Sequence, residues 1–161
     1  MDKSNADKKD KIESIFYLHR SIISLYFKDF EDVYTLPEGL NFTHMRAAMI
    51  IRFQGHITMS ELSKELVLEK GSFTPVAATL IKKGIVKKEQ SLVDRRVYNL
   101  VLTEKGERLT LDFRNDHWDF IESGFECLDI DEQNEYYKFV NGLNYYNKKM
   151  EREKSKTSLV P

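Results

Sequence analysis

The sequence is poor in the residues that mark secreted and membrane proteins. It has one cysteine in 161 residues, and a single thiol, Cys127, cannot form an internal disulfide. No apolar run approaches the roughly 18 residues that a membrane-spanning helix needs. The N-terminal residues MDKSNADKKDK lack the apolar core of a signal peptide. These absences predict a protein of the reducing cytoplasm with no membrane partner.

Catalytic motifs are also absent from the sequence. It contains no glycine-rich phosphate loop, no nucleophile elbow and no repeated metal-ligand spacing. The four histidines are scattered, and no two of them form a His-x-x-x-His pair. We therefore expect no enzyme and no bound cofactor or metal. A zinc site that borrows His44, His117 and nearby carboxylates stays open as an alternative.

Helical periodicity dominates what the sequence does contain. Apolar residues make up 41% of the chain, enough for one domain over residues 1–161. Their three- and four-residue spacing predicts a long first helix, Ile12 to Phe30, and a second at about Thr43 to Phe53. Two short helices follow between Thr58 and Lys83, a long fifth one after Thr103, and a sixth beyond a break at 129–131. Residues 153–161 are expected to be a tail.

Local stop and start signals support these helices. Thr58 and Glu61 have the spacing of a capping box, which predicts a helix whose Met59, Leu62 and Leu66 face inward. Gly84 is the stop signal of the fourth helix. Thr103 is the expected cap of the fifth.

A β-hairpin is predicted between Gly84 and Gly106. A short β-rich run, residues 85–88, leads to a polar tip, and the alternating run 97–102 returns from it. The tip carries one acidic and two basic residues, Asp94, Arg95 and Arg96. A compact helix pair followed by a basic hairpin is the layout of a winged helix-turn-helix. The predicted fold is thus mainly α with a small hairpin wing.

Charge is distributed unevenly along the chain. Residues 58–105 contain nine Lys/Arg against six Asp/Glu, a net +3, whereas residues 1–57 balance at eight against eight and residues 106–161 contain eight against twelve, a net −4; these sum to the overall −1. Between Lys82 and Arg96 there are six basic residues and two acidic ones. Because phosphate contacts depend on local positive charge, this segment is the candidate DNA-binding surface.

Long apolar faces on the terminal helices predict a second subunit. The first, fifth and sixth helices are rich in Phe, Tyr and Ile, more than a small helix-turn-helix core needs for its own covering. A two-fold partner would bury these faces and would place two recognition helices about one turn of DNA apart. The alternative is that these helices wrap their own domain.

Two motifs resemble the MarR family (multiple-antibiotic-resistance regulators). DRRVYNLVLTEKG resembles the wing of that family, with its Asp-x-Arg tip and Leu-Thr-x-x-Gly end, and LEKGSFTPVAATLIKKGIV resembles its recognition helix. The resemblance implies dimerisation helices at about 10–54 and 104–152 around a winged helix-turn-helix at 55–103. It further implies a homodimeric bacterial transcription factor, usually a repressor, that a small ligand or an oxidant releases from DNA.

The recognition helix departs from the usual family pattern at Pro75, where many relatives have arginine. Proline is tolerated only in a first turn, so the helix should begin no earlier than Ser72, capped there or at Gly71. The start resembles the Gly-Thr-x-Thr-Pro of peroxide-sensing relatives. Hydroxyls of Ser72 and Thr74 can reach phosphates or base edges, while Phe73 and Thr79 are less certain, a core position being favoured for Phe73.

At the wing, the resemblance implies that Asp94 pairs with one arginine while another basic residue enters the minor groove. We favour Arg95 in the groove, where the potential is most negative, and Arg96 as the buttress, although the sequence does not order them. Nearby lysines are phosphate contacts or plain surface. The candidate DNA-contacting residues are Ser72, Phe73, Thr74, Pro75, Thr79, Lys82, Lys88, Asp94, Arg95 and Arg96.

An effector cavity is expected between the first, second and fifth helices near the dimer interface. An arginine or a histidine there could hold an anionic group while aromatic rings cover the apolar part of a small effector. The same aromatics also suit a plain core, and the two histidines at positions 19 and 117 suit core histidines. The candidate lining residues are His19, Tyr26, His44, Arg46, Trp118 and Phe120.

Three other functions stay open from the sequence. A metal-responsive regulator of the same fold would use the scattered histidines, and a redox-responsive one would use Cys127, although that cysteine lies far from the first helix and on the edge of an apolar face. The third is a winged-helix module that binds proteins and has no affinity for DNA.

Overall fold

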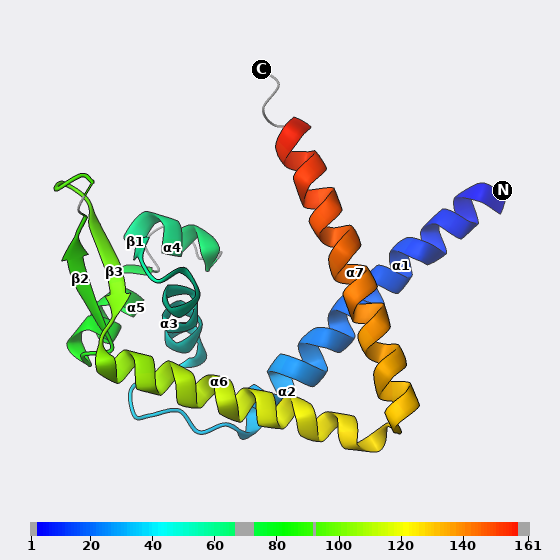
Figure 1. Cartoon of the computed structure of the whole chain (residues 1–161), viewed down its shortest axis with the longest axis horizontal. Coiled ribbons are helices and arrows are strands. Elements are labelled where there is room, and N and C mark those ends of the chain that lie inside the picture. Colours follow the sequence, from blue (N-terminus) through cyan, green and yellow to red (C-terminus); the bar gives the residue numbers. More distant parts are fainter. Residues whose placement is uncertain (1–2, 67–72, 92, 158–161) are drawn as a thin grey trace. The chain divides into compact units, whose positions relative to one another are not determined.

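The computed structural model describes residues 3–66, 73–91 and 93–157 (Figure 1). The chain divides into two compact units, Met1–Phe120 and Ile121–Pro161. None of the described helices is both long enough and apolar enough to cross a bilayer. The helices and strands are α1 (Lys3–Ile23), a π-helical turn (Ser24–Lys28), α2 (Asp29–Val33), α3 (Phe42–Gln54), β1 (Ile57–Thr58), α4 (Met59–Glu65), α5 (Phe73–Lys82), β2 (Val86–Gln90), β3 (Tyr98–Leu102), α6 (Glu104–Gly124), a 3-10 turn (Phe125–Cys127) and α7 (Ile130–Thr157).

The predicted first helix is an unbroken helical run of three parts, α1, the π-helical turn and α2. It extends to Val33, a little beyond the predicted end at Phe30. The ring of Phe30 is buried against α6, where it packs on Phe113 and stacks on His117 with a centroid separation of 4.5 Å. A π turn adds one residue to a helical turn, and it therefore changes which face the following residues present.

The core of the first unit lies between α3, α4, α5 and the sheet. Its members are apolar side chains at helical spacing, such as Ala47, Ala48 and Ile51 on α3 and Val76, Ala77 and Leu80 on α5. Leu62 of α4 is fully buried among them, and Met59 and Leu66 pack against the cluster, as the periodicity predicted. This burial holds α5 at a fixed angle to the sheet.

Helix ends follow the signals in the sequence. Thr58 and Glu61 form the predicted capping box at the start of α4. At the end of α5, Ile85 N donates to Leu80 O and Gly84 N donates to Ile81 O, both at 2.9 Å. With Gly84 at φ +67°, these two bonds make a Schellman ending, in which a left-handed residue favours glycine.

A three-stranded antiparallel sheet of order β1-β3-β2 forms the wing and its base. Val86 pairs with Leu102 at the base and Gln90 with Tyr98 near the tip. The predicted hairpin is therefore confirmed. Strand β1 was not predicted, because two residues carry no alternation; Ile57 pairs with Leu100 on the far side of β3.

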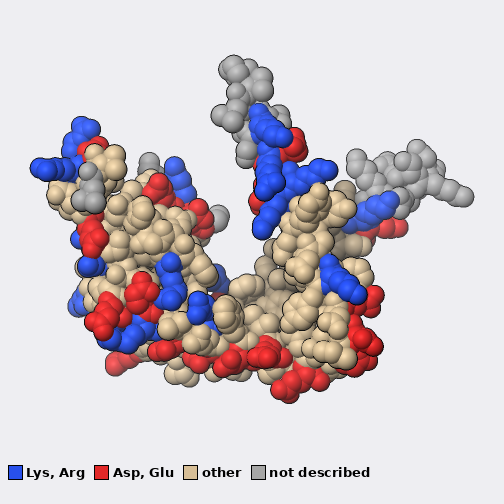
Figure 2. Space-filling model, in the orientation of Figure 1, with Lys and Arg blue, Asp and Glu red and all other residues tan. Residues whose placement is uncertain are grey.

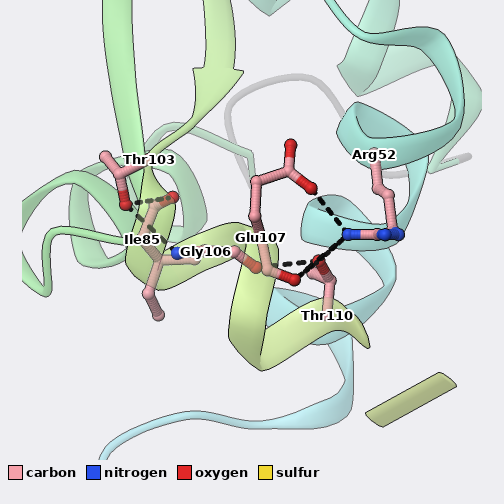
Figure 3. Close-up of polar contacts among 6 residues, drawn as sticks. All are labelled: Arg52, Ile85, Thr103, Gly106, Glu107 and Thr110. Carbon is pink, nitrogen blue, oxygen red and sulfur yellow. Dashed lines mark hydrogen bonds and ion pairs between the residues drawn. The ribbon is translucent and has the colours of Figure 1, made fainter. Parts of the chain in front are cut away.

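The start of α6 is bonded to the start of the wing (Figure 3). Thr103 N donates to Ile85 O at 3.0 Å, the Thr103 hydroxyl donates to Gly84 O at 2.6 Å, and Gly106 N donates back to that hydroxyl at 3.1 Å. Thr103 is thus the predicted cap of α6. A Cβ on Gly106 would stand 2.1 Å from Ile85 O, so this junction has no room for any side chain.

A second contact, missed by the sequence analysis, binds α3 to α6 (Figure 3). The Arg52 guanidinium donates to the Glu107 carboxylate at 2.6 Å, to the Glu107 main-chain oxygen at 3.1 Å and to the hydroxyl of the fully buried Thr110 at 3.2 Å. Thr110 in turn donates to Gly106 O at 2.7 Å. The arginine therefore ties the end of α3 to the same turn of α6 that contacts the wing.

The second unit contains the end of α6 and α7. Asp129 caps α7 by accepting from the main-chain N–H groups of Asp131 and Glu132, each at 2.9 Å, which confirms the predicted break. The ring of Phe125 packs on Tyr136 and Tyr137 of α7.

The junction predicts that Gly106→Ala destabilises the protein. Alanine normally stabilises a helix interior by about 0.8–1 kcal/mol relative to glycine. Here its methyl group collides with a main-chain oxygen, and such overpacking costs about 1–3 kcal/mol. We expect a lower midpoint in urea unfolding followed by circular dichroism.

Gly142→Ala is the matched control, because nothing lies within 4 Å of a Cβ at that position of α7. This variant should be as stable as the unaltered protein or more so. Equal stability of the Gly106→Ala and Gly142→Ala variants would contradict the close contact.

Candidate nucleic-acid interface and effector pocket

Helix α5 presents a narrow outer face. Its buried residues recur at helical spacing, and the opposite side exposes Thr74, Pro75, Ala78 and Lys82. Pro75 lies in the first turn, as expected from its missing N–H. The exposed side chains are short except for the lysine, so the main chain of this face can approach a flat surface closely.

Two of the candidate DNA-contacting residues on α5 are less accessible than a DNA contact requires. Phe73 is 3% exposed and belongs to the core cluster, which confirms the core position favoured for it and removes its ring from the candidate DNA contacts. Thr79 is half-buried, and its hydroxyl donates to Pro75 O at 2.9 Å. Ser72 and the expected cap at Gly71 lie outside the described residues.

The tip of the wing is tied together by hydrogen bonds. Ser91 N donates to Val97 O, and Val97 N donates to Asp94 O, both at 2.9 Å. The Ser91 hydroxyl accepts from Val93 N at 3.2 Å, and the Gln90 amide donates to Arg95 O at 2.5 Å. This network fixes the direction in which the side chains of the tip project.

Asp94 and Arg96 form the predicted pair. Arg96 donates to the Asp94 carboxylate through Nε and Nη2, each at 3.3 Å, and through its main-chain N at 2.9 Å. These bonds, the guanidinium first, lower the pKa of the Asp94 carboxyl. Arg96 is therefore the arginine that stabilises the wing tip through Asp94.

Arg95 is exposed, and no carboxylate of the described residues is within ion-pair distance of its guanidinium. Lys88 is also exposed, while its neighbour Lys87 pairs with Glu89 at 2.6 Å. Figure 2 shows Lys and Arg side chains gathered at the end of the wing. The tip therefore combines a fixed shape with uncompensated positive charge.

Two exposed residues beside these were missed. Ala78 stands one turn after Thr74 on the outer face of α5, and its position at i+4 is the signal that could have found it. Val93 is 98% exposed at the wing tip. An apolar residue at a turn has no sequence signal of its own, because only the tip's geometry shows which way it points.

A pocket of about 350 Å³ lies between the first helical run, α3 and α6. Of the six predicted ligand-binding residues, Arg46 and Trp118 line it. Phe120 lies behind the wall, where its ring packs on Phe30. The lining residues are Phe27, Phe30, Glu31, Phe42, Arg46, Met49, Phe53, Phe113, Arg114, His117 and Trp118.

The other three predicted ligand residues do not line the pocket. His44 is the third residue of α3 and forms a capping box with the N-cap Asn41: its Nδ1 accepts from Asn41 N at 3.1 Å, and its own main-chain N–H donates to the Asn41 side chain. Tyr26 contributes its main-chain oxygen, which accepts from His117 Nε2. His19 is exposed on α1, so the expectation of a core histidine is wrong for His19 and confirmed for the half-buried His117.

Two guanidinium groups give the pocket its polarity. Arg46 pairs with Glu31 at 2.5 Å. Arg114 lies 4.6 Å from the centroid of the Trp118 ring, and its buried Nε has no hydrogen-bond partner among the described residues. A buried donor without a partner is costly, and a ligand oxygen would satisfy it.

Tyr34 fixes the aromatic wall behind the pocket. Its ring packs on Phe30 and Phe113, and its hydroxyl donates to Asp116 at 3.1 Å. Burial, followed by this bond and the charges of Asp116 and Asp112, raises the pKa of Tyr34 to about 12. The phenol therefore stays neutral and keeps its bond over the physiological range.

The arrangement of the described residues does not add support for a metal-responsive or a redox-responsive regulator. In the part of the chain that the structure describes, no three His, Cys, Asp or Glu side chains are grouped so as to hold a metal ion. Cys127 is exposed in the 3-10 turn, not buried as a small apolar residue, and its thiol donates to Gly124 O at 3.3 Å.

A short helix with an open outer face, held on a core beside a basic hairpin, defines the winged helix-turn-helix class of DNA-binding proteins. The MarR family model matches residues 40–98, which contain α3, the helix pair and most of the wing. The chain is 30% identical over 114 residues to the HTH-type transcriptional regulator SarZ of Staphylococcus haemolyticus, covering 70% of this chain and 73% of that one. This chain belongs to the MarR family of transcriptional regulators.

Solved structures share the fold. Streptococcus pneumoniae FabT, solved in complex with DNA, superposes with a TM-score of 0.61 at 22% identity, covering 91% of this chain and 99% of that one. Bordetella bronchiseptica BpsR, described as regulated in its DNA binding by 6-hydroxynicotinic acid, gives 0.57 at 17% identity, covering 81% and 98%.

Proposed function

We propose that this protein is a cytoplasmic, homodimeric repressor that binds operator DNA and leaves it when a small aromatic acid fills the pocket beside α6. The observation that carries the DNA-binding role is the wing tip. There, Asp94 is occupied by Arg96, which leaves the neighbouring Arg95 uncompensated and exposed.

In the proposed complex, α5 lies in the major groove and the wing in an adjacent minor groove. Thr74 and Ala78 face base edges, and Lys82 and Lys88 face phosphates. Arg95 enters the minor groove, where a narrow groove concentrates negative potential and favours a guanidinium. The crystal complex of FabT with DNA supports this use of the fold.

The dimer is proposed from the exposed apolar residues of the terminal helices. Ile15 and Phe16 of α1 are 66% and 70% exposed, and Phe139 of α7 is 70% exposed. Monomeric proteins rarely leave contiguous apolar faces of this kind in water. A second copy, related by a two-fold axis, covers the same faces on both subunits and gives the two half-site contacts of an operator.

Release by a ligand is proposed from the chemistry of the pocket beside α6. Aromatic rings form most of its walls, and the partnerless Arg114 Nε supplies a donor for an anionic oxygen. BpsR, which shares the fold, is regulated by an aromatic acid. Filling the pocket would favour one position of α6, and α6 is bonded directly to the wing.

Arg95→Ala should weaken binding to the DNA upstream of the gene. Loss of an arginine that contacts DNA bases costs about 1–3 kcal/mol, so we expect at least about a fivefold rise in Kd at fixed salt. The salt dependence of binding should also become shallower, because fewer counterions are released. Fluorescence anisotropy with labelled duplex at several salt concentrations measures both quantities.

Arg152→Ala on α7 is the matched control, since it removes the same charge outside the wing and α5. It should bind DNA like the unaltered protein. If Arg95→Ala and Arg152→Ala bind equally well, the role given to the wing is wrong.

Phe16→Glu should separate the subunits. A charge placed within an apolar interface is not compensated and disfavours association. Sedimentation velocity should give one chain of 19.0 kDa in place of twice that mass. Val93→Glu also places a charge at an exposed apolar residue, but one at the wing tip, and this variant should remain dimeric. A Phe16→Glu variant that sediments like the unaltered protein would contradict a dimer through α1.

Benzoate should bind next to Trp118, the only tryptophan of the chain. We expect saturable change of its fluorescence, no such change with the neutral benzamide, and at least fivefold weaker binding in Arg114→Met, which keeps the length of the side chain and removes its donors. Arg20→Met is the control. Equal binding of benzoate and benzamide would exclude an acid as the ligand class.

A further inference from the structure

A second pocket, of about 330 Å³, lies on another surface of α6, where the loop before α3 meets the end of α5. It shares no lining residue with the pocket beside Trp118. Its walls are aliphatic, with Leu40, Ile85 and Leu109, and three cations surround them: Lys83, Lys105 and Arg108. Aliphatic walls with convergent charges are the usual make-up of a small-molecule site.

Each of the two lysines of this second pocket donates one hydrogen bond to a main-chain oxygen. Lys83 Nζ donates to Glu38 O at 2.5 Å, and Lys105 Nζ donates to Lys83 O at 2.9 Å. Neither ammonium has a carboxylate within ion-pair distance among the described residues. An ammonium has three donors, so each lysine retains two for a ligand.

The loop is shaped around the half-buried ammonium of Lys83. Gly39 has φ +74°, and a Cβ there would stand 2.9 Å from Lys83 Nζ. The positive charge of Lys83 also contributes, after burial, to lowering the pKa of His44 on α3. Lys83 is therefore held in the pocket wall, and its positive charge is not neutralised by an ion pair with a carboxylate of the described residues.

The charges that line the second pocket favour a ligand with a single negative charge. The lining holds three cations and two carboxylates, Glu38 and Asp112, a formal balance of +1. Arg108 is engaged by Glu104, so the two lysines are the cations with open donors. A monocarboxylate would meet them without a second negative charge facing the acids, and the aliphatic walls suit an aliphatic body better than a ring.

We propose that this second pocket binds a short aliphatic carboxylate between Lys83 and Lys105. The site lies next to the last turn of α5 and the first residue of the wing. A ligand there would contact Lys83 and Ile85, the residues that directly follow α5, on the side away from the proposed DNA surface. Through these residues it could change the DNA affinity that the proposed function assigns to α5. Binding itself does not depend on that function.

Hexanoate is the probe, and methyl NMR of the whole protein is the measurement. The Ile85 methyl signals report this pocket, and the Met49 methyl signal reports the one beside Trp118. We expect hexanoate to shift Ile85 saturably and hexanamide, its neutral counterpart, to leave it in place. Lys105→Gln, an exposed substitution that keeps the fold, should weaken hexanoate binding at least fivefold, while Lys87→Gln should not.

Any of three results would overturn the proposal: no saturable shift of Ile85, an equal shift with hexanamide, or unchanged affinity in Lys105→Gln. A shift confined to Met49 would assign hexanoate to the other pocket and would likewise reject this site. DNA affinity, measured separately by anisotropy, distinguishes failure of this site from failure of the proposed repressor function.

Discussion

The wing and α6 meet at a point where a main-chain oxygen occupies the space that a side chain would need. Gly106 lies against Ile85 O, and Thr103 bonds both to that oxygen and to Gly84 O. Since Gly84 and Ile85 also end α5, three elements meet within two residues of the chain. Because of these contacts, the first turn of α6 cannot rotate without moving the residues at the base of β2.

That constraint makes α6 the element that connects the wing to both proposed ligand pockets. The same helix holds the wing junction, the clamp from Arg52 and the wall that contains Arg114 and Trp118. Gly106 and His117 are eleven residues apart, or about 16 Å at the rise of an α-helix. In the proposed mechanism, a ligand that favours one position of this wall would act on the wing through the rigid helix, without a chain of small side-chain movements. The proposed release from DNA is consistent with this geometry.

Local signals were enough to predict most of the fold. The capping box of Thr58 and Glu61, the glycine at the end of α5 and the alternation in the hairpin each depend on a few neighbouring residues, and all three were predicted. Strand β1 was missed because its identity comes from a partner strand far along the chain: Ile57 pairs with Leu100, 43 positions later. His44 was misplaced for the opposite reason: its bond is local, to Asn41, but a histidine in a capping box is not a pattern that spacing alone favours.

The candidate site was predicted unevenly for the same physical reason. Asp94 and Arg96 are two residues apart, so their pairing follows from the turn. The pocket beside α6 depends on side chains from three distant segments. Sequence could place Arg46 and Trp118 on the right faces, but it could not show that Arg114 retains a donor without a partner. Likewise, the burial of Phe73 depends on what packs opposite it.

The outer face of α5 limits how the proposed operator is read. Bidentate recognition uses arginine or lysine for guanine and asparagine or glutamine for adenine. The described part of α5 exposes no arginine, asparagine or glutamine, and its exposed lysine, Lys82, is proposed to face a phosphate. Thr74 and Ala78 can contact a thymine methyl, and the Thr74 hydroxyl can also make single hydrogen bonds, which discriminate less. If operator binding is as proposed, much of the selectivity would come from the shape of the DNA, through the width of the minor groove that Arg95 is proposed to enter. The hydrogen bonds of the wing tip suit that proposal, because a guanidinium can respond to groove width only if it projects from a fixed backbone.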